Sequence, residues 1–139
     1  MKIINNIQSP LCSFKASKLL KEAGMAVPTK SAFNGSGVEM DEEPYDEDSY
    51  EESYYLKLEN FIYRPTHCLA LAWIKVNFKI QLFLDYTYYD GFHYGYKWVK
   101  ANGDYGIIWK DNDDNPSGCD TAFEATEFAI EYTLENLIK

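Results

Sequence analysis

The clearest pattern in the sequence is an alternation of apolar and polar residues in the stretch 78–88. Side chains of a strand point alternately to its two faces, so a period of two predicts a half-buried strand. The apolar positions of this strand are Phe78, Ile80, Leu82, Leu84, Tyr86 and Tyr88. The dipeptides Asp90-Gly91 and Asn102-Gly103, which tolerate the positive φ of tight hairpins, then divide the aromatic segments that follow. The pattern therefore predicts a three-stranded antiparallel meander over 78–109.

Amphipathic segments on either side of the meander predict two helices. The first follows Pro65, with Thr66 as its candidate N-cap, and the second starts at Thr121 with Glu124 three positions on, as in a capping box. We expect one apolar stripe of each helix to face the core. These stripes are Leu69, Ala72, Trp73 and Val76 in the first helix, and Ala125, Phe128, Ala129 and Tyr132 in the second.

A third helix is predicted near the N-terminus, between Ser13 as N-cap and Gly24 as the left-handed cap at its end. Shorter strand-like segments at 27–33 and 54–63 can enlarge the sheet. Because the apolar face of an antiparallel sheet needs a cover, we expect an α+β fold, in which helices lie on one face of an antiparallel three- to five-stranded sheet. Its core is α-β-β-β-α plus the N-terminal helix, and a length of 139 residues predicts a single domain, 1–139.

Negative charge is concentrated in one stretch. The chain has 22 acidic and 13 basic residues, and nine of the acids lie between Glu39 and Glu52 with no base among them. The other 13 acids balance the 13 basic residues, so the net charge of −9 comes from this stretch. Like charges repel one another and resist burial, so residues 34–53 are predicted to form an exposed acidic loop or insertion. Its candidate partner-binding residues are Glu42, Glu43, Tyr45, Asp46, Glu47 and Asp48.

Aromatic residues are dense in the predicted meander, which holds 11 of the 23 in the chain. If helices cover one parity of its strands, the other parity must face outward or meet another surface. That parity contains Phe83 and Tyr89, with Trp98 or Tyr94 according to the register. Exposed aromatic side chains favour contact with a partner, because they bury a large area at low entropic cost. The alternative is that the N-terminal segment covers them.

The last predicted helix also carries a row of glutamates, Glu124, Glu127, Glu131 and Glu135, opposite its apolar stripe. This acidic ridge and the acidic loop can together attract a basic surface. The alternative role of the acidic loop is to keep an aromatic-rich protein in solution.

Catalytic and metal-binding patterns are not found. His67 adjoins Cys68, but neighbours on a helix point about 100° apart and do not form a catalytic pair. The acidic stretch 111–115 is not followed by the glycine and the glutamate that a calcium loop requires. Cys-x-x-Cys spacing and a phosphate-cradling glycine loop are also missing. We therefore expect a non-enzymatic protein without metal or cofactor.

The remaining features predict a cytoplasmic location. Three cysteines, odd in number and far apart, are typical of reduced thiols. The sequence contains no apolar run long enough to span a membrane, and the segment 1–8 lacks the pattern of a signal peptide.

Three segments carry a resemblance to known proteins. They are 13–29, with Ser13-Phe14-Lys15-Ala16-Ser17-Lys18-Leu19-Leu20; 64–80, with Arg64-Pro65-Thr66 and Ala70-Leu71-Ala72-Trp73-Ile74-Lys75; and 123–131. With these the chain resembles a set of small uncharacterised proteins of Bacteroides-type bacteria and of their phages or mobile elements. The resemblance covers about a third of the chain and implies no known activity. Relative to that pattern the acidic stretch looks like an insertion.

The order helix, three strands, helix is also similar to the double-stranded-RNA-binding domain. That domain holds phosphates with lysines leading into its final helix, whereas this chain has four aspartates between Asp111 and Asp120 and then the acidic ridge. Phosphate would be repelled, so we expect no direct binding of nucleic acid.

Two functions follow as expectations. The first is an accessory protein of a phage or mobile element that binds another protein, or its own copy as a homo-oligomer, through the aromatic sheet face and the acidic segment. The alternative is an acidic mimic of nucleic acid that inhibits a basic nucleic-acid-binding protein of host defence or DNA processing.

Overall fold

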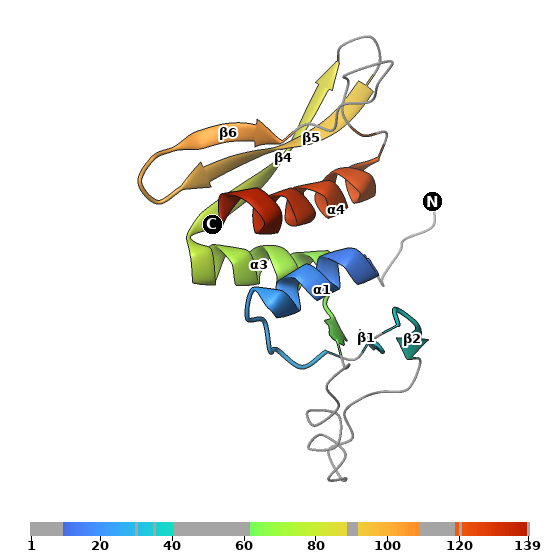
Figure 1. Cartoon of the computed structure of the whole chain (residues 1–139). Coiled ribbons are helices and arrows are strands. Elements are labelled where there is room, and N and C mark those ends of the chain that lie inside the picture. The colour runs from blue at the N-terminus through green and yellow to red at the C-terminus, as the bar shows by residue number, and fades with distance from the viewer. Residues whose placement is uncertain are drawn as a thin grey trace, which may run out of the picture.

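The structure, a computed structural model, describes residues 10–29, 31–34, 36–40, 62–88, 92–108, 119 and 121–138. Its helices are α1 (Phe14–Glu22), α3 (His67–Phe78) and α4 (Ala122–Tyr132), and α4 continues into a π-helical turn, η1 (Thr133–Leu137). Its strands are β1 (Ser31–Phe33), β2 (Glu39–Met40), β3 (Ile62–Arg64), β4 (Ile80–Tyr88), β5 (Phe92–Lys100) and β6 (Tyr105–Ile108). They form two antiparallel sheets, ordered β2-β1-β3 and β4-β5-β6 (Figure 1). The predicted α+β fold is confirmed, and α3-β4-β5-β6-α4 is its predicted core order.

Each of the three predicted N-cap residues caps the start of its helix with a side-chain hydrogen bond. The hydroxyl of Ser13 accepts a hydrogen bond from the Ala16 N–H at 3.1 Å, and the hydroxyl of Thr66 accepts one from Leu69 at 3.2 Å. At α4 the Thr121 hydroxyl accepts from the Glu124 N–H at 3.1 Å. These bonds satisfy N–H groups that the first helical turn leaves without partners, so local sequence determines where the helices begin.

The register of the meander decides which side chains share a face. Leu82 lies opposite Trp98, which lies opposite Gly106 on the third strand. One residue along, Phe83 lies opposite Lys97 and Lys97 opposite Ile107. Directly opposite residues point to the same side of a sheet, so the first row belongs to the inner face and the second to the outer face.

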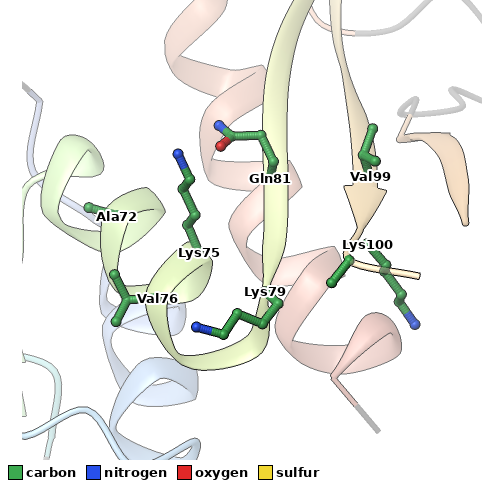
Figure 2. Close-up of a pocket in the computed structure, with 8 residues that line it drawn as sticks. Ala72, Lys75, Val76, Lys79, Gln81, Val99 and Lys100 are labelled. Atoms are coloured by element: carbon green, nitrogen blue, oxygen red, sulfur yellow. The ribbon is translucent and has the colours of Figure 1, made fainter. Parts of the chain in front are cut away.

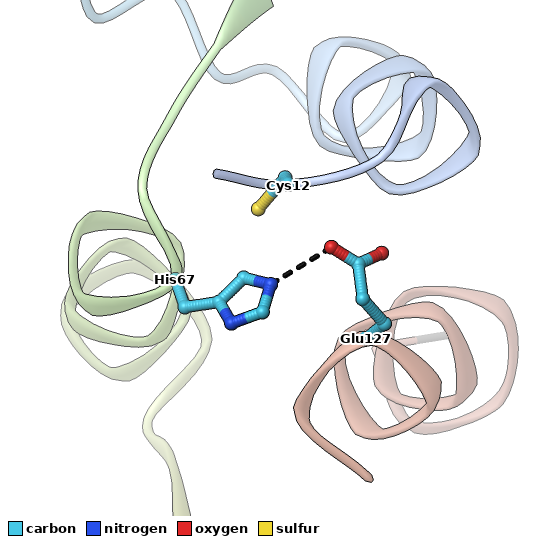
Figure 3. Close-up of side chains that lie close together, drawn as sticks. All are labelled: Cys12, His67 and Glu127. Carbon is cyan, nitrogen blue, oxygen red and sulfur yellow. Dashed lines mark hydrogen bonds and ion pairs between the residues drawn. The ribbon is translucent and has the colours of Figure 1, made fainter. Parts of the chain in front are cut away.

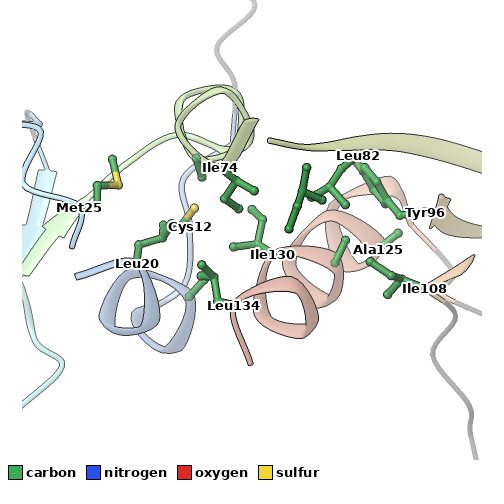
Figure 4. Packing of buried hydrophobic residues seen from close by; sticks show 14 of the residues in the cluster. Cys12, Leu20, Met25, Ile74, Leu82, Tyr96, Ile108, Ala125, Ile130 and Leu134 are labelled. Carbon is green, nitrogen blue, oxygen red and sulfur yellow. The ribbon is translucent and has the colours of Figure 1, made fainter. Parts of the chain in front are cut away.

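The inner face packs on α4, which lies between the sheet and the other two helices (Figure 1). Leu82 and Tyr96 of this face are buried in one core with Ala125 and Ile130 of α4 and Ile74 of α3 (Figure 4). The phenol of Tyr96 and the hydroxyl of Thr126 are 2.8 Å apart, which satisfies two polar groups within the core. The core therefore joins the meander to all three helices.

The predicted apolar stripe of α3 is confirmed for Leu69 and Trp73, which pack against the core, and wrong for Ala72 and Val76. The buried residues of this helix are His67, Ala70 and Ile74, whereas Ala72 is exposed and Val76 is 66% exposed. The helix is apolar nearly all round, so the period of its apolar residues does not identify the face that packs. Leu84 of β4 is 49% exposed, because α4 packs mainly against the central strand β5 and β4 is an edge strand.

Within the described residues, no helix combines the length and the apolar composition needed to cross a membrane.

Candidate functional site

Four large apolar side chains lie together on the outer face of the meander. Phe83 of β4 is 49% exposed, Val99 of β5 38%, and Tyr105 and Ile107 of β6 80% and 62%. Val99 lies directly opposite Tyr105, and the row of Phe83 and Ile107 is the next outer row. We call these four residues the outer patch. The expected outward position of Phe83 is confirmed.

Two other predicted partner-binding aromatics do not belong to this face. Trp98 and Tyr94 point to the inner side, where they are partly buried and pack against the core. The indole of Trp98 covers Gly106, where an added Cβ would lie 2.7 Å from its Nε1. The register of β4 with β5 pairs even-numbered residues with even-numbered ones, which places both rings on the side of Leu82. The prediction that Tyr94 or Trp98 faces outward is therefore wrong.

The other predicted contact residues lie outside the described residues. They are Tyr89 of the meander and, in the acidic loop, Glu42, Glu43, Tyr45, Asp46, Glu47 and Asp48.

An open groove of about 570 Å³ adjoins the outer patch where the end of α3 meets β4. Figure 2 shows its walls, with Lys75 and Val76 on the helix and Gln81 and Val99 on the strands. The full lining is Ala72, Lys75, Val76, Lys79, Gln81, Val99, Lys100 and Ala101. Three of these residues are lysines and none is acidic, so the groove combines an apolar wall with positive charge. Val99 belongs both to the groove and to the outer patch, so the two surfaces are continuous.

The acidic ridge predicted on the last helix is not a continuous exposed surface. Glu124 is exposed, but Glu127 is buried. Glu131 and Glu135 both lie close to Lys15 of α1, whose Nζ is 3.6 Å and 3.3 Å from their carboxylate oxygens. The packing of α1 beside α4 turns this side of the helix inward and supplies the compensating charge. The prediction that Glu127 belongs to an exposed ridge is therefore wrong, and Glu131 is half-buried and paired with Lys15.

The burial of Glu127 completes a cluster that the sequence did not predict, formed by Cys12, His67 and Glu127 (Figure 3). His67 Nε2 lies 2.8 Å from Glu127 Oε1, and the same oxygen accepts a hydrogen bond from the Ser13 N–H at 2.8 Å. The ligand atoms of the three side chains all lie within 4.8 Å of one another. Their relative exposures are 0%, 5% and 9%, so the cluster is buried where the starts of α1 and α3 meet α4.

The surroundings of the cluster shift the pKa of the Cys12 thiol and of the Glu127 carboxyl in opposite directions. Burial raises the pKa of the Cys12 thiol to about 12, and the nearby Glu127 carboxylate adds to the rise. Burial also acts to raise the pKa of Glu127, but the hydrogen bonds from His67 and Ser13 outweigh it, so the pKa lies below its ordinary value. Cys12 is therefore a protonated, enclosed thiol near neutral pH, which opposes a role as an attacking nucleophile.

The cluster was missed because its members are distant in the sequence. Cys12 precedes His67 by 55 positions and Glu127 follows it by 60. The expectation that His67 and Cys68 point apart is confirmed, since His67 is buried and Cys68 is exposed. The available signal was Glu127 itself, because an acid one position from the apolar stripe of a helix can lie at the edge of the buried face.

A scan against protein-family models finds no match for this chain, and searches of curated proteins and of solved structures find no significant match. Function is therefore inferred from the geometry and chemistry of these surfaces.

Proposed function

We propose that the protein is a non-enzymatic module that binds an acidic segment of another protein, one that also carries apolar or aromatic side chains. Its docking surface is the outer patch together with the adjoining groove. The observation that carries the proposal is the gathering of Phe83, Val99, Tyr105 and Ile107 on one exposed face across three strands. Exposed apolar side chains that lie together, rather than singly, are typical of interaction surfaces.

The charges around the patch select the chemistry of the partner. Lys75 and Lys79 line the groove, and Lys97 lies between Phe83 and Ile107 on the outer face. Of the acids that the structure describes, Asp85 belongs to the same face and Asp104 lies in the turn before Tyr105. Carboxylates of a partner would meet the lysines at the rim while its apolar side chains cover the patch, which is the usual division of an interface into apolar centre and polar rim.

The predicted origin in a phage or mobile element rests on the sequence resemblance alone. The alternative of a nucleic-acid mimic is weaker, because Glu127 of its ridge is buried and both Glu131 and Glu135 are paired with Lys15. We therefore favour the apolar docking surface over an electrostatic decoy.

A random glutamate–tyrosine copolymer is a suitable probe, because it has the chemistry of the expected partner. We expect fluorescence anisotropy to show binding at about 50 mM salt that weakens at about 500 mM, where the Debye length falls to a few Å. Polyglutamate without tyrosine should bind more weakly, and a lysine–tyrosine copolymer should not bind. Tyr105→Ser combined with Ile107→Ser should lower the affinity at least tenfold.

Val38→Ser is the matched control, because Val38 is 57% exposed but lies just before β2, away from the meander strands that carry the outer patch. It should bind like the unmodified protein. Equal affinity of the patch variant and the control would refute the docking surface. Sedimentation without probe tests the homo-oligomer: a dimer abolished by the same double substitution would identify a second copy as the occupant.

A further inference from the structure

We propose that Cys12, His67 and Glu127 form a binding site for a zinc ion. The inference departs from the sequence-based expectation of no metal, and it does not depend on the docking surface, which involves other residues. Thiolate, imidazole and carboxylate are the three side-chain ligand types that zinc takes in proteins. Here one of each comes from a different part of the chain, and the fold brings them together.

The three ligand atoms lie near the separations that a tetrahedral zinc site requires. Zinc bonds of about 2.0–2.3 Å require ligand atoms roughly 3.3–3.6 Å apart. The three ligand atoms lie within 4.8 Å of one another, and His67 Nε2 and Glu127 Oε1 are 2.8 Å apart. Rotations of side chains that bring the sulfur closer and separate the nitrogen from the oxygen are sufficient. The fourth position is left to water.

A second observation also suggests a cation. Glu127 Oε2 is buried, and no donor among the described residues reaches it. Oε1, in contrast, accepts hydrogen bonds from both His67 and Ser13. A buried carboxylate oxygen without a partner is costly, and a metal ion would satisfy it.

Arg64, whose positive charge acts on Cys12, is already paired with a carboxylate outside the cluster. Arg64 donates from Nε to the Cys12 carbonyl at 2.7 Å and forms an ion pair with Glu39. Its charge is therefore shared with a carboxylate outside the cluster. A divalent ion would face one carboxylate and one thiolate, which together balance its two positive charges.

Binding would proceed with loss of one proton. The Cys12 thiol gives its proton to the buffer as its sulfur forms the bond to zinc. The neutral imidazole moves its hydrogen from Nε2 to Nδ1, so that the Nε2 lone pair can bind, and the ionised carboxylate binds without losing a proton. Because the three ligands meet only in the folded chain and are enclosed there, the ion would join during folding. Zinc at this position would connect the start of α1 with α3 and α4.

The test uses the full chain, unfolded with chelator and reductant and then refolded with one equivalent of Zn²⁺ or Co²⁺. We expect one ion per chain after gel filtration, and for cobalt a thiolate-to-metal charge-transfer band with the intense visible bands of four-coordinate Co²⁺. Cys12→Ser should abolish the charge-transfer band, and Glu127→Gln should lower zinc affinity at least tenfold. Cys68→Ser is the matched control, because Cys68 adjoins His67 but is exposed, and it should leave the spectrum unchanged.

A second variant keeps the test decisive if Cys12→Ser fails to fold. In Cys68→Ser/Cys119→Ala, Cys12 is the one remaining thiol of the chain, so the charge-transfer band must persist. Absence of the band there, failure of the unmodified chain to retain metal, or unchanged binding in a folded Cys12→Ser variant would each overturn the proposal.

Discussion

His67 and Glu127 form a buried pair, with Nε2 2.8 Å from Oε1, that joins the first turn of α3 to α4. The N–H of Ser13, at the start of α1, donates a hydrogen bond to the same carboxylate oxygen. Glu127 Oε1 is therefore hydrogen-bonded to residues of both α1 and α3. The contact thus lies where the three helices converge.

Removing one partner of this pair should be strongly destabilising. Glu127→Ala leaves His67 and the Ser13 N–H without their acceptor, and we expect a loss of about 3 kcal/mol in the free energy of unfolding in metal-free buffer. In a double-mutant cycle with His67→Ala, the coupling should be about 1–3 kcal/mol. Urea denaturation gives the free energy of unfolding of the unmodified protein, the two single variants and the double variant.

Glu124→Ala is the control for that cycle, because Glu124 lies on the same helix but is exposed. Glu124→Ala removes only the favourable interaction of this carboxylate with the N-terminus of the helix, so we expect the free energy of unfolding to fall by about 0.5 kcal/mol. If the effects of the His67 and Glu127 substitutions on the free energy of unfolding were additive, there would be no energetic coupling between the two side chains, which would contradict this prediction.

Glu131 should make stability fall as pH rises. Burial raises the pKa of this carboxyl above its ordinary value of 4.5, although Lys15 opposes the rise. An acid with a raised pKa in the folded state contributes stability that is complete below its ordinary pKa and lost as pH rises through the raised value. Glu131→Gln stays neutral, so its stability relative to the unmodified protein should improve between pH 4 and pH 7.

Urea denaturation across that range checks the effect. Glu135→Gln is the matched control, because Glu135 interacts with the same Lys15 but is exposed. It should show a smaller relative gain. A relative stability of Glu131→Gln that falls over the same range would contradict the assignment.

The three thiols should differ sharply in reactivity. Cys68 is exposed, whereas Cys12 and Cys119 are buried and burial raises the pKa of Cys12 to about 12. Since the thiolate is the reactive form, a disulfide reagent should modify one thiol rapidly in the native, metal-free protein and three after unfolding. Cys68→Ser should remove the rapid phase. Modification of Cys12 at the rate of Cys68 would show that the cluster is open to solvent.

Two isoleucines test the assignment of inner and outer surfaces. Ile130 of α4 is fully buried, so Ile130→Ala should cost about 3 kcal/mol through lost burial and the cavity that it leaves. Ile107 is 62% exposed on the outer patch, and Ile107→Ala should change the free energy of unfolding by no more than about 0.5 kcal/mol. Thermal and urea unfolding provide both values. A large loss for Ile107→Ala would mean that this face is covered within the protein.

Much of the architecture follows from local sequence. The hydroxyls of Ser13, Thr66 and Thr121 cap their helices as predicted, because a cap requires only residues three positions apart. The alternation from Ile80 and the turn at Asn102-Gly103 likewise predict strands and a hairpin, and Gly103 has the expected positive φ of 94°. These features depend on backbone geometry and on neighbours in the chain.

Tertiary packing decided which faces are buried and which side chains meet. On a helix that is apolar nearly all round, the period of the apolar residues could not show that Ile74 is buried and Val76 exposed. The register of β4 with β5, which composition does not determine, places Trp98 on the inner face. Glu127 was predicted to be a surface charge, but the position of α1 and α3 beside α4 encloses it with Cys12 and His67. A side chain's burial and its partners depend on elements far away in the sequence, whereas its tendency to start a helix or alternate in a strand does not.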